Sequence, residues 1–365
     1  MARLRIGIDA RELIGDTTGA GRYLGELLKR WVARSDAAAR IFTLYSPEPL
    51  PWAGALPGVE PRILEGARGT WWEQTTLRRA VAQDPPDVFF APAYTAPWRL
   101  PCPLVATIHD VSFAAHPEWF SRREGTRRRL LARRAARRAA AILTISEFSR
   151  GEISKHFGVP PDRITVVPPG VSRRPDLGAP REPLVLYVGS IFNRRRVPEL
   201  VAAFARVARR CADARLVIAG ANRTHPHLDV EGIVRAQGLG DRMAVREYVD
   251  DDELQSLYGR ASVFVFLSEY EGFGMTPVEA LASGVPIVVL DTPVAREVYG
   301  AAATYVDPAD IERQTADALV RLLGDPEARR AALAPAASVL SRYSWDAAAD
   351  RVLALIEATA RSSTR

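Results

Sequence analysis

The stretch Ser268-Glu-Tyr-Glu-Gly-Phe-Gly-Met-Thr-Pro-Val-Glu-Ala-Leu-Ala-Ser-Gly-Val-Pro286 follows a short apolar run and joins a glycine-rich turn to a helical pattern. Gly272 and Gly274 permit a close approach of the backbone to a ligand. Thr276 before Pro277 predicts a helix N-cap with proline at the first helical position. A helix N-terminus offers free N–H groups and the positive end of a dipole, so this turn predicts an anion site suited to a diphosphate.

Two glutamates flank the predicted diphosphate site. Glu271 precedes the turn, and Glu279 lies one turn inside the predicted helix. Both carboxylates could face the same ligand, Glu271 toward a sugar and Glu279 toward a ribose. Taken as an isolated Gly-x-Gly turn, the pattern also fits glycines that only cap the helix and glutamates that face solvent.

Outward from this stretch, short apolar runs alternate with longer helical patterns. This rhythm predicts parallel sheets covered by helices, an α/β fold. The predicted strands are Leu4–Asp9, Ile41–Tyr45, Asp87–Ala91, Leu104–His109, Ala141–Ile145, Ile164–Val167, Leu184–Val188, Leu216–Ala219, Ala244–Tyr248, Val263–Leu267 and Ile287–Leu290. The predicted helices of the first half are Gly21–Ala33, Trp71–Gln83, Ser121–Ala139 and Glu147–Phe157, and an amphipathic helix is predicted at the end, Trp345–Ala360.

A linker separates the two halves. The segment 167–183 is rich in proline, glycine and arginine and lacks periodicity. It predicts two Rossmann-like domains, 1–172 and 173–344, followed by the terminal segment 345–365. Because ligands of open α/β sheets bind beyond the carboxyl ends of the strands, we expect functional residues on the loops that follow strands.

Length and composition fit two globular domains. The chain has 365 residues, of which 47% are hydrophobic and 25% charged, and a net charge of +6. The cysteines, Cys102 and Cys211, lie outside any CxxC spacing, which predicts reduced thiols and no structural metal. No apolar run reaches the roughly 18–20 residues that cross a bilayer, and the start of the chain does not read as a signal peptide. We therefore expect a cytoplasmic protein.

Three further loops carry candidate residues. The loop after the strand at 184–188 contains Ser190 and the run Arg194-Arg-Arg196, which could bind phosphate bidentately. His109 and Asp110 end a first-half strand. Thr18-Gly-Ala-Gly-Arg-Tyr23 follows the first predicted strand and opens a helix, and it contains Gly19, Gly21 and Arg22. A solvated basic loop and a capping His-Asp pair are the simpler interpretations of the first two.

In their order along the chain, these segments resemble the GT4 family of glycosyltransferases, the glycosyl transferases group 1. Its signature is two glutamates separated by seven residues, as Glu271 and Glu279 are. The resemblance implies a retaining, metal-independent enzyme of GT-B fold, with two Rossmann-like domains facing a cleft and the last helix crossing back to the first domain. Where the family commonly has lysine, this chain has Arg195, and where many relatives have arginine after the glycine, it has Ser190, so Arg194 is the candidate second charge.

The resemblance also implies roles for the site residues. His109 and Glu271 would be catalytic, with Asp110 beside the histidine, Glu279 would bind the ribose, and Gly19, Gly21 and Arg22 would form the acceptor and phosphate loop. The expected donor is a GDP-, UDP- or dTDP-sugar carrying a hexose, with mannose as the leading candidate, and the expected acceptor is a glycan or a lipid-linked molecule. No cofactor and no metal are expected. The predicted diphosphate-binding residues are Arg194, Arg195, Gly272, Phe273, Gly274, Met275 and Thr276.

Alternatives stay open at this point. A nucleotide-sugar epimerase or hydrolase could use the same fold, and so could a catalytically silent scaffold that binds nucleotide sugars. The segment Arg122–Arg138 contains nine arginines and an apolar face predicted at Leu130, Leu131, Ala135 and Ala136. It fits a helix with a solvated arginine face, or a basic face resting on the anionic inner surface of the plasma membrane. A nucleic-acid partner is not expected, since no recognition fold or aromatic platform accompanies the arginines.

Overall fold

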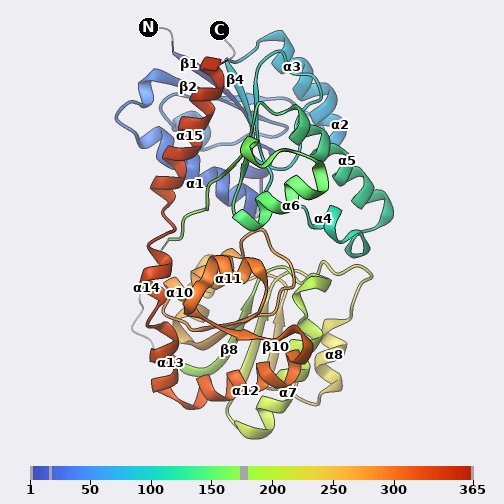
Figure 1. Ribbon diagram of the computed structural model, residues 1–365, viewed down its shortest axis with the longest axis vertical. Helices are drawn as coiled ribbons and strands as arrows, with labels where there is room; N and C mark the ends of the chain where they lie inside the picture. The colour runs from blue at the N-terminus through green and yellow to red at the C-terminus, as the bar shows by residue number, and fades with distance from the viewer. Residues whose placement is uncertain (1–2, 16–18, 173–179, 363–365) are drawn as a thin grey trace. The chain divides into compact units, whose positions relative to one another are not determined.

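The computed structural model describes residues 3–15, 19–172 and 180–362, and these form two compact units (Figure 1). The first unit comprises Met1–Pro117, Arg122–Gly170 and Ser344–Arg365. The second comprises Val171–Tyr343 together with Glu118–Ser121. The sequence places that short segment in the first domain, but the ring of Trp119 packs edge-on against Tyr270, with 6.3 Å between the ring centroids.

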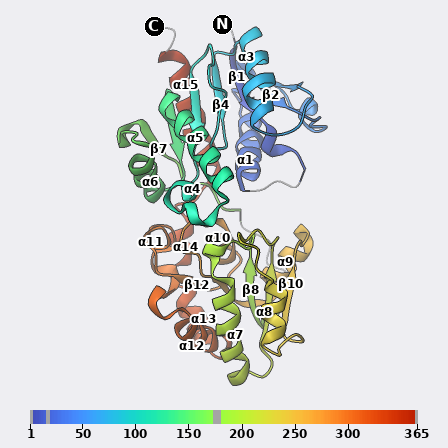
Figure 2. The same cartoon turned by 90° about the vertical axis from the view of Figure 1, so that its right-hand side faces the viewer.

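The first unit contains a seven-stranded parallel sheet in the order β3-β2-β1-β4-β5-β6-β7. Its interior strands are runs of buried apolar residues, as expected for a sheet covered on both faces. The strands are β1 Leu4–Asp9, β2 Arg40–Ser46, β3 Val59–Ile63, β4 Val88–Ala91, β5 Leu104–Thr107, β6 Ala141–Thr144 and β7 Ile164–Val166. The helices are α1 Gly19–Ala33, α2 Thr70–Trp72, α3 Arg78–Gln83, α4 Ser112–Ala115, α5 Arg122–Arg138, α6 Glu147–Phe157 and α15 Trp345–Ser362 (Figure 2).

The second unit repeats this plan with a six-stranded parallel sheet in the order β10-β9-β8-β11-β12-β13. The strands are β8 Glu182–Val188, β9 Arg215–Ala219, β10 Met243–Arg246, β11 Ala261–Phe266, β12 Ile287–Leu290 and β13 Ala303–Val306. The helices are α7 Val197–Arg210, α8 Val230–Ala236, α9 Asp251–Arg260, α10 Met275–Ala282, α11 Pro293–Tyr299, α12 Ile311–Gly324, α13 Pro326–Leu333 and α14 Ala336–Leu340.

In each sheet the strand order reverses at one point, and this point positions the candidate residues. The reversal lies between β1 and β4 in the first unit and between β8 and β11 in the second. Crossover connections leave such a point on opposite sides of the sheet, which opens a crevice at the carboxyl ends of the two central strands. The arginine loop follows β8 and the glutamate-glycine turn follows β11.

The last helix, α15, belongs to the first unit and packs on α1. The Trp31 indole donates a hydrogen bond to the Ala349 carbonyl at 2.9 Å, and Arg40 forms an ion pair with Glu357 at 2.6 Å. Ile356 is completely buried. A helix from the end of the chain therefore completes the hydrophobic core of the unit that begins it.

The sequence predicted the fold class correctly and missed some elements. The α/β class and the parallel sheets are confirmed, but the edge strands β3 and β13 were not predicted. The predicted helix Trp71–Gln83 is broken into α2, a π-helical turn at Glu73–Leu77 and α3. The middle of the predicted linker, 173–179, lies outside the described residues. No described helix is long and apolar enough to cross a membrane.

Candidate functional site

The loop after β8 places two arginines side by side in the second unit. Gly189 has a φ of +135°, and a Cβ there would lie 2.5 Å from Nη1 of Arg195, so glycine makes room for the guanidinium. Arg195 donates from Nη1 to the Ser190 carbonyl at 2.7 Å and stacks on Phe266, with its guanidinium carbon 4.8 Å from the ring centroid. The backbone of Ser190, rather than its hydroxyl, is therefore what holds this arginine.

Glu271 joins this loop to the turn after β11. Its carboxylate accepts from Arg195 Nε at 3.0 Å and from the Ser268 hydroxyl at 2.9 Å, and it lies 3.8 Å from Arg194 Nε. Burial acts to lower the pKa of Arg195, but the nearby Glu271 and Tyr187 outweigh it, so the pKa rises and the guanidinium stays charged. The structure thus brings two predicted diphosphate-binding arginines and one predicted catalytic glutamate together.

The three consecutive arginines have different surroundings. Arg194 donates to the Tyr270 carbonyl at 3.0 Å and lies over the Phe192 ring. Arg196 has a left-handed backbone, with φ of +49°, and its guanidinium pairs with Glu269 and Glu199 instead of Glu271. Because its backbone is left-handed, Arg196 directs its side chain to Glu269 and Glu199 and away from Arg194 and Arg195.

The glycine-rich turn ends at the N-terminus of α10, but its cap differs from the prediction. The helix begins at Met275, and its N-cap is Gly274, with φ of +85° and no side-chain cap. Thr276 lies inside the first turn, so the prediction that it is the N-cap was wrong. A Cβ at Gly274 would lie 2.0 Å from the Tyr299 hydroxyl, so the tertiary contact with α11 and the backbone hand both require glycine.

The other predicted residues of the turn are buried around this cap. Phe273 packs edge-on against Tyr343, with 5.0 Å between the ring centroids. The Tyr299 hydroxyl lies 3.1 Å from the Gly274 carbonyl and 3.3 Å from the Phe273 carbonyl. Glu279 is buried inside α10. Tyr299 and Tyr343 therefore hold the turn in place through their contacts with Phe273 and Gly274. The turn ends where α10 begins.

In the first unit, His109 follows β5 and is held on several sides. Its Nε2 lies 2.9 Å from the Pro92 carbonyl, and its own carbonyl accepts from the Ser149 hydroxyl at 3.0 Å. A carbonyl only accepts, so Nε2 carries the proton and Nδ1 is the acceptor. Burial lowers the pKa of His109, although the Pro92 carbonyl and Asp110 oppose the shift, so the ring is held in its neutral form.

Asp110 positions neighbouring groups. Its carboxylate accepts from the Tyr94 hydroxyl at 3.0 Å and from the backbone N–H of Ser112 at 2.8 Å. Tyr94 has a φ of +61°, which is rare for a residue with a side chain, and its ring lies 5.4 Å from that of His109. The sequence did not single out Tyr94. Its place directly after β4, at the reversal of strand order, was the available signal.

The predicted glycine loop is partly helical. Gly19 and Gly21 lie in the first turn of α1, as does Arg22, while Thr18 lies outside the described residues. No atom lies within 4 Å of a Cβ built at Gly19, whereas Gly21 is buried. The helix begins two residues earlier than predicted, so these residues present a helix start rather than a loop.

A buried ion network in the first unit was also missed. The guanidinium of Arg11 pairs with Asp9 at the end of β1 and with Glu73 in the π-helical turn. Burial raises the pKa of Glu73, while Arg11 opposes the rise. The Thr95 hydroxyl donates to the same carboxylate, so the network connects the end of β1, the π-helical turn and the segment after β4. Glu73 and Thr95 are far from Asp9 and Arg11 in the sequence, and no sequence pattern predicted their contact.

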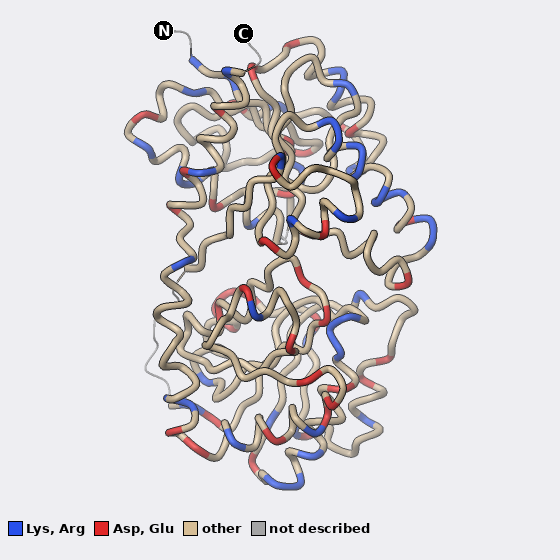
Figure 3. The backbone as a smooth tube through the Cα atoms, in the orientation of Figure 1, with Lys and Arg blue, Asp and Glu red and all other residues tan. Residues whose placement is uncertain are grey.

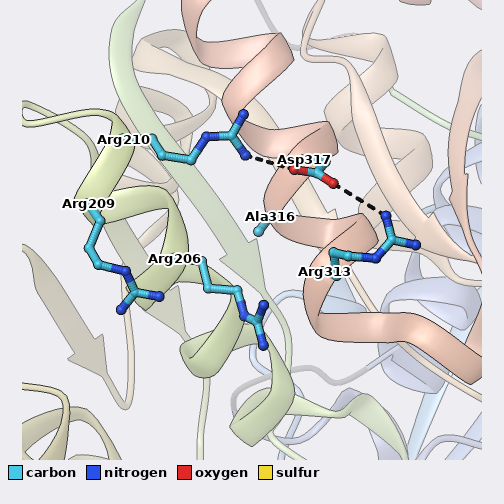
Figure 4. A pocket seen from close by; sticks show the side chains of 6 residues that line it. All are labelled: Arg206, Arg209, Arg210, Arg313, Ala316 and Asp317. Carbon is cyan, nitrogen blue, oxygen red and sulfur yellow. Dashed lines mark hydrogen bonds and ion pairs between the residues drawn. The ribbon is translucent and has the colours of Figure 1, made fainter.

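A separate arginine-lined hollow lies between α7 and α12 (Figure 4). Arg210 and Arg313 both pair with Asp317, and Arg206 pairs with Glu312. This hollow adjoins the last turn of α7, about 15 Å along the helix from the loop that carries Arg195. It is therefore distinct from the candidate site. Within the described ranges, no three His, Cys, Asp or Glu side chains form a group that could hold a metal ion.

Comparisons with known proteins show the family of the chain. Residues 17–174 match the family described as Glycosyltransferase Family 4, and residues 172–338 match Glycosyl transferases group 1. The MMP alpha-(1->4)-mannosyltransferase of Mycolicibacterium hassiacum is 32% identical over 274 residues, 70% of this chain and 65% of that protein. The alpha-D-kanosaminyltransferase of Streptomyces kanamyceticus is 30% identical over 68% of this chain and 69% of that protein. The O-antigen chain mannosyltransferase B of Escherichia coli is 27% identical over 90% and 93%.

Solved structures share the fold. A sucrose-phosphate synthase from Thermosynechococcus elongatus matches with a TM-score of 0.77 and 19% identity over 97% of this chain and 98% of that one. Anabaena Alr3699/HepE in complex with UDP-glucose matches with a TM-score of 0.75 and 17% identity over 98% and 100%. The fold is GT-B, and the chain belongs to the GT4-type group 1 glycosyltransferases. It is a glycosyltransferase enzyme.

Proposed function

We propose that the chain transfers a hexose, with mannose as the leading candidate, from a nucleotide-diphosphate sugar to a glycan or lipid-linked acceptor. The anomeric configuration would be retained and no divalent ion would be required. The observation that carries the proposal is the cluster of Arg194, Arg195 and Glu271 at the reversal of strand order in the second sheet. Two curated relatives named as mannosyltransferases support the choice of mannose.

The proposed chemistry is electrostatic. A departing nucleoside diphosphate gains negative charge as the sugar–phosphate bond breaks, and preorganised positive groups then stabilise it more than they stabilise the donor. Arg194, Arg195 and the backbone amides from Gly272 to Thr276 would supply that stabilisation. Because Glu271 fixes the Arg195 guanidinium beforehand, little reorganisation would accompany the reaction. In this proposal Glu271 also orients the donor sugar and Glu279 binds the ribose.

The proposed role of the first unit is to bind the acceptor. A neutral His109 with Nδ1 as its acceptor atom could receive a hydrogen bond from a sugar hydroxyl without repelling or attracting charge. Gly19, Gly21 and Arg22 would lie near the donor phosphate or the acceptor. A lipid-linked acceptor would place the enzyme at the inner face of the plasma membrane, in contact with the cytoplasm.

Thermal unfolding of the purified chain in EDTA, with a panel of GDP, UDP, dTDP and their sugars, tests the donor site. A ligand that binds only the folded state raises the melting temperature. We expect one nucleotide family to raise it in the wild type and neither Arg195→Ala nor Glu279→Ala to respond. Arg209→Ala is the matched control, because Arg209 is exposed and lies at the far end of α7.

The outcomes separate the alternatives. A shift that survives Arg195→Ala would contradict the assigned diphosphate site, and a shift that requires added Mg²⁺ would contradict metal independence. No shift with any nucleotide or nucleotide sugar at millimolar concentration would contradict donor binding, and with it the proposed transferase. Once the base is known, incubation with the nucleotide sugar but no acceptor distinguishes transfer from epimerisation or hydrolysis, because only the latter two would turn over the donor alone.

A further inference from the structure

The helix α5 presents an uncompensated positive surface on the first unit. Nine of its residues are arginine and one, Glu124, is acidic. Glu124 pairs with Arg128 at 2.6 Å. Among the described residues, the other exposed arginines of this helix form no ion pair: Arg122, Arg123, Arg127, Arg129, Arg133, Arg137 and Arg138. Of these, Arg127 donates to the Thr70 hydroxyl and Arg137 to the Phe157 carbonyl, both neutral groups. In Figure 3 blue segments recur along this helix, separated by short tan stretches.

Apolar side chains stand on the same surface. The sequence predicted Leu130 on one apolar face with Leu131, Ala135 and Ala136. In the structure Leu130 is 57% exposed, because the buried face of the helix is formed by Leu131, Ala132, Ala135 and Ala136. Helical spacing places Arg123, Leu130, Arg133 and Arg137 along one outward face, at intervals of seven, three and four residues. Leu130 therefore places an exposed aliphatic side chain among the exposed arginines of this face.

Two exposed tryptophans flank this face from other elements. Trp98 is 38% exposed and lies under the Arg134 guanidinium, whose carbon is 4.3 Å from the ring centroid. Trp71 is 80% exposed, and its neighbour Thr70 lies 3.5 Å from Nη1 of Arg127. Gln74 bonds the Trp98 backbone and so connects the two segments. We define the α5 face as Arg123, Leu130, Arg133, Arg137, Trp71 and Trp98.

We propose that the α5 face docks on an anionic phospholipid bilayer. Arginines attract anionic headgroups, while tryptophan and leucine side chains insert at the boundary of headgroups and acyl chains. The inference rests on the proposed function only in that a docked enzyme would meet lipid-linked acceptors. The α4 helix, which follows His109, packs against α5, so the docked face and the proposed acceptor residues share one rigid part of the unit.

The composition of the face favours lipid over nucleic acid. Arginine and tryptophan could both contact a single-stranded nucleic acid, by phosphate pairing and base stacking. Leu130 at the centre of the helix face offers no stacking surface and no hydrogen bond, but it gains free energy in an acyl environment. The three-element combination of an aliphatic centre, aromatic flanks and unpaired arginines matches the interfacial region of a bilayer.

Co-sedimentation of the full chain with vesicles tests the proposal. The vesicles are pure phosphatidylcholine, or phosphatidylcholine with about 30% phosphatidylglycerol as the anionic lipid. We expect binding to the anionic vesicles only, weakened at least about tenfold by Arg123→Glu/Arg133→Glu and by Trp71→Ser/Leu130→Ser. All four positions are exposed, so the variants should fold, and their melting curves and nucleotide-induced shifts check both folding and the donor site independently of the vesicles.

Two control variants test whether a change in charge, or the loss of an exposed tryptophan, is enough to weaken binding when it lies outside the α5 face. Arg209→Glu/Arg321→Glu makes the same change in charge at two exposed arginines of the second unit, and Trp52→Ser removes a tryptophan that is 42% exposed elsewhere. Both controls should bind vesicles like the wild type. The proposal is overturned if anionic vesicles do not bind at low salt, if the controls lose as much binding as the test variants, if Trp71→Ser/Leu130→Ser binds normally, or if single-stranded RNA binds more tightly than the vesicles and displaces them.

Discussion

At the residue scale, Glu271 is the residue on which the second-unit site depends. Two guanidiniums within 4 Å of one carboxylate would repel each other if that carboxylate were lost. The stacking of Arg195 on Phe266 limits its movement further. The spacing of Glu271 and Glu279 was visible in the sequence, but the pairing of Glu271 with the arginines was not, because 75 residues separate Glu271 from Arg195.

His109 allows a prediction on pH. Its folded-state pKa is lowered from 6.5 by burial, so the unfolded chain takes up this proton first as the pH falls. The contribution of His109 to stability is therefore complete above about pH 6.5 and is lost as the pH falls toward the folded pKa. We expect the free energy of unfolding to drop more between about pH 7.5 and pH 5.5 in the wild type than in His109→Gln.

Urea unfolding at the two pH values measures that difference. Each unit of pKa lowering corresponds to about 1.4 kcal/mol at most. His227→Gln serves as the control for the substitution itself, since His227 is exposed. An equal drop in the wild type and in His109→Gln would show that this ring is not held neutral by the fold.

At the scale of elements, the start of α10 shows how a cap can be set by a neighbouring helix. The Thr-Pro pair follows the preferred sequence of a helix start, yet the helix begins before it. Gly274 supplies the left-handed turn, and the Tyr299 hydroxyl from α11 occupies the space where a side chain would stand. By contrast, the cap of α6 is purely local, because the Ser146 side chain accepts from the backbone N–H of Ser149 three residues later.

Gly274→Ala should destabilise the second unit by roughly 1–3 kcal/mol, from the left-handed backbone and the contact with Tyr299. The measurement is urea unfolding of the two single variants and the double variant with Tyr299→Phe. Removing the hydroxyl relieves the contact, so we expect the double variant to be more stable than the sum of the two losses predicts. Gly240→Ala is the control, with open space and no positive φ. If the losses of stability in Gly274→Ala and Tyr299→Phe simply add in the double variant, the contact with the Tyr299 hydroxyl is not the cause of the destabilisation.

At the scale of the whole molecule, each unit has its own sheet and its own reversal of strand order, and the chain returns to the first unit through α15. Apolar residues of α15 are buried in that unit, with Val352 and Ile356 fully enclosed. The stability of the unit that begins the chain therefore depends on residues about 320 positions later, such as the Ala349 carbonyl that Trp31 bonds.

Ile356→Ala should lower the free energy of unfolding of the first unit by about 2–5 kcal/mol. In calorimetry we expect a lower melting temperature for the first unit. The rise in melting temperature that nucleotides cause in the second unit should remain. Ala354→Ser on the exposed side of α15 should leave both transitions in place. If Ile356→Ala also abolished the nucleotide-induced shift, the hydrophobic cores of the two units would not be independent.

Patterns along the chain were enough to predict the α/β class, the two parallel sheets, most strands, the exact bounds of α6 and the family. These follow from local periodicity, capping and short motifs, which depend on neighbours in the chain. Tertiary structure alone decided the edge strands β3 and β13, the cap of α10, the pairing of Arg195 with Glu271, the buried network of Asp9, Arg11 and Glu73, and the exposure of Leu130. Each of these depends on which distant segments share space, because burial and charge pairing are set by three-dimensional neighbours.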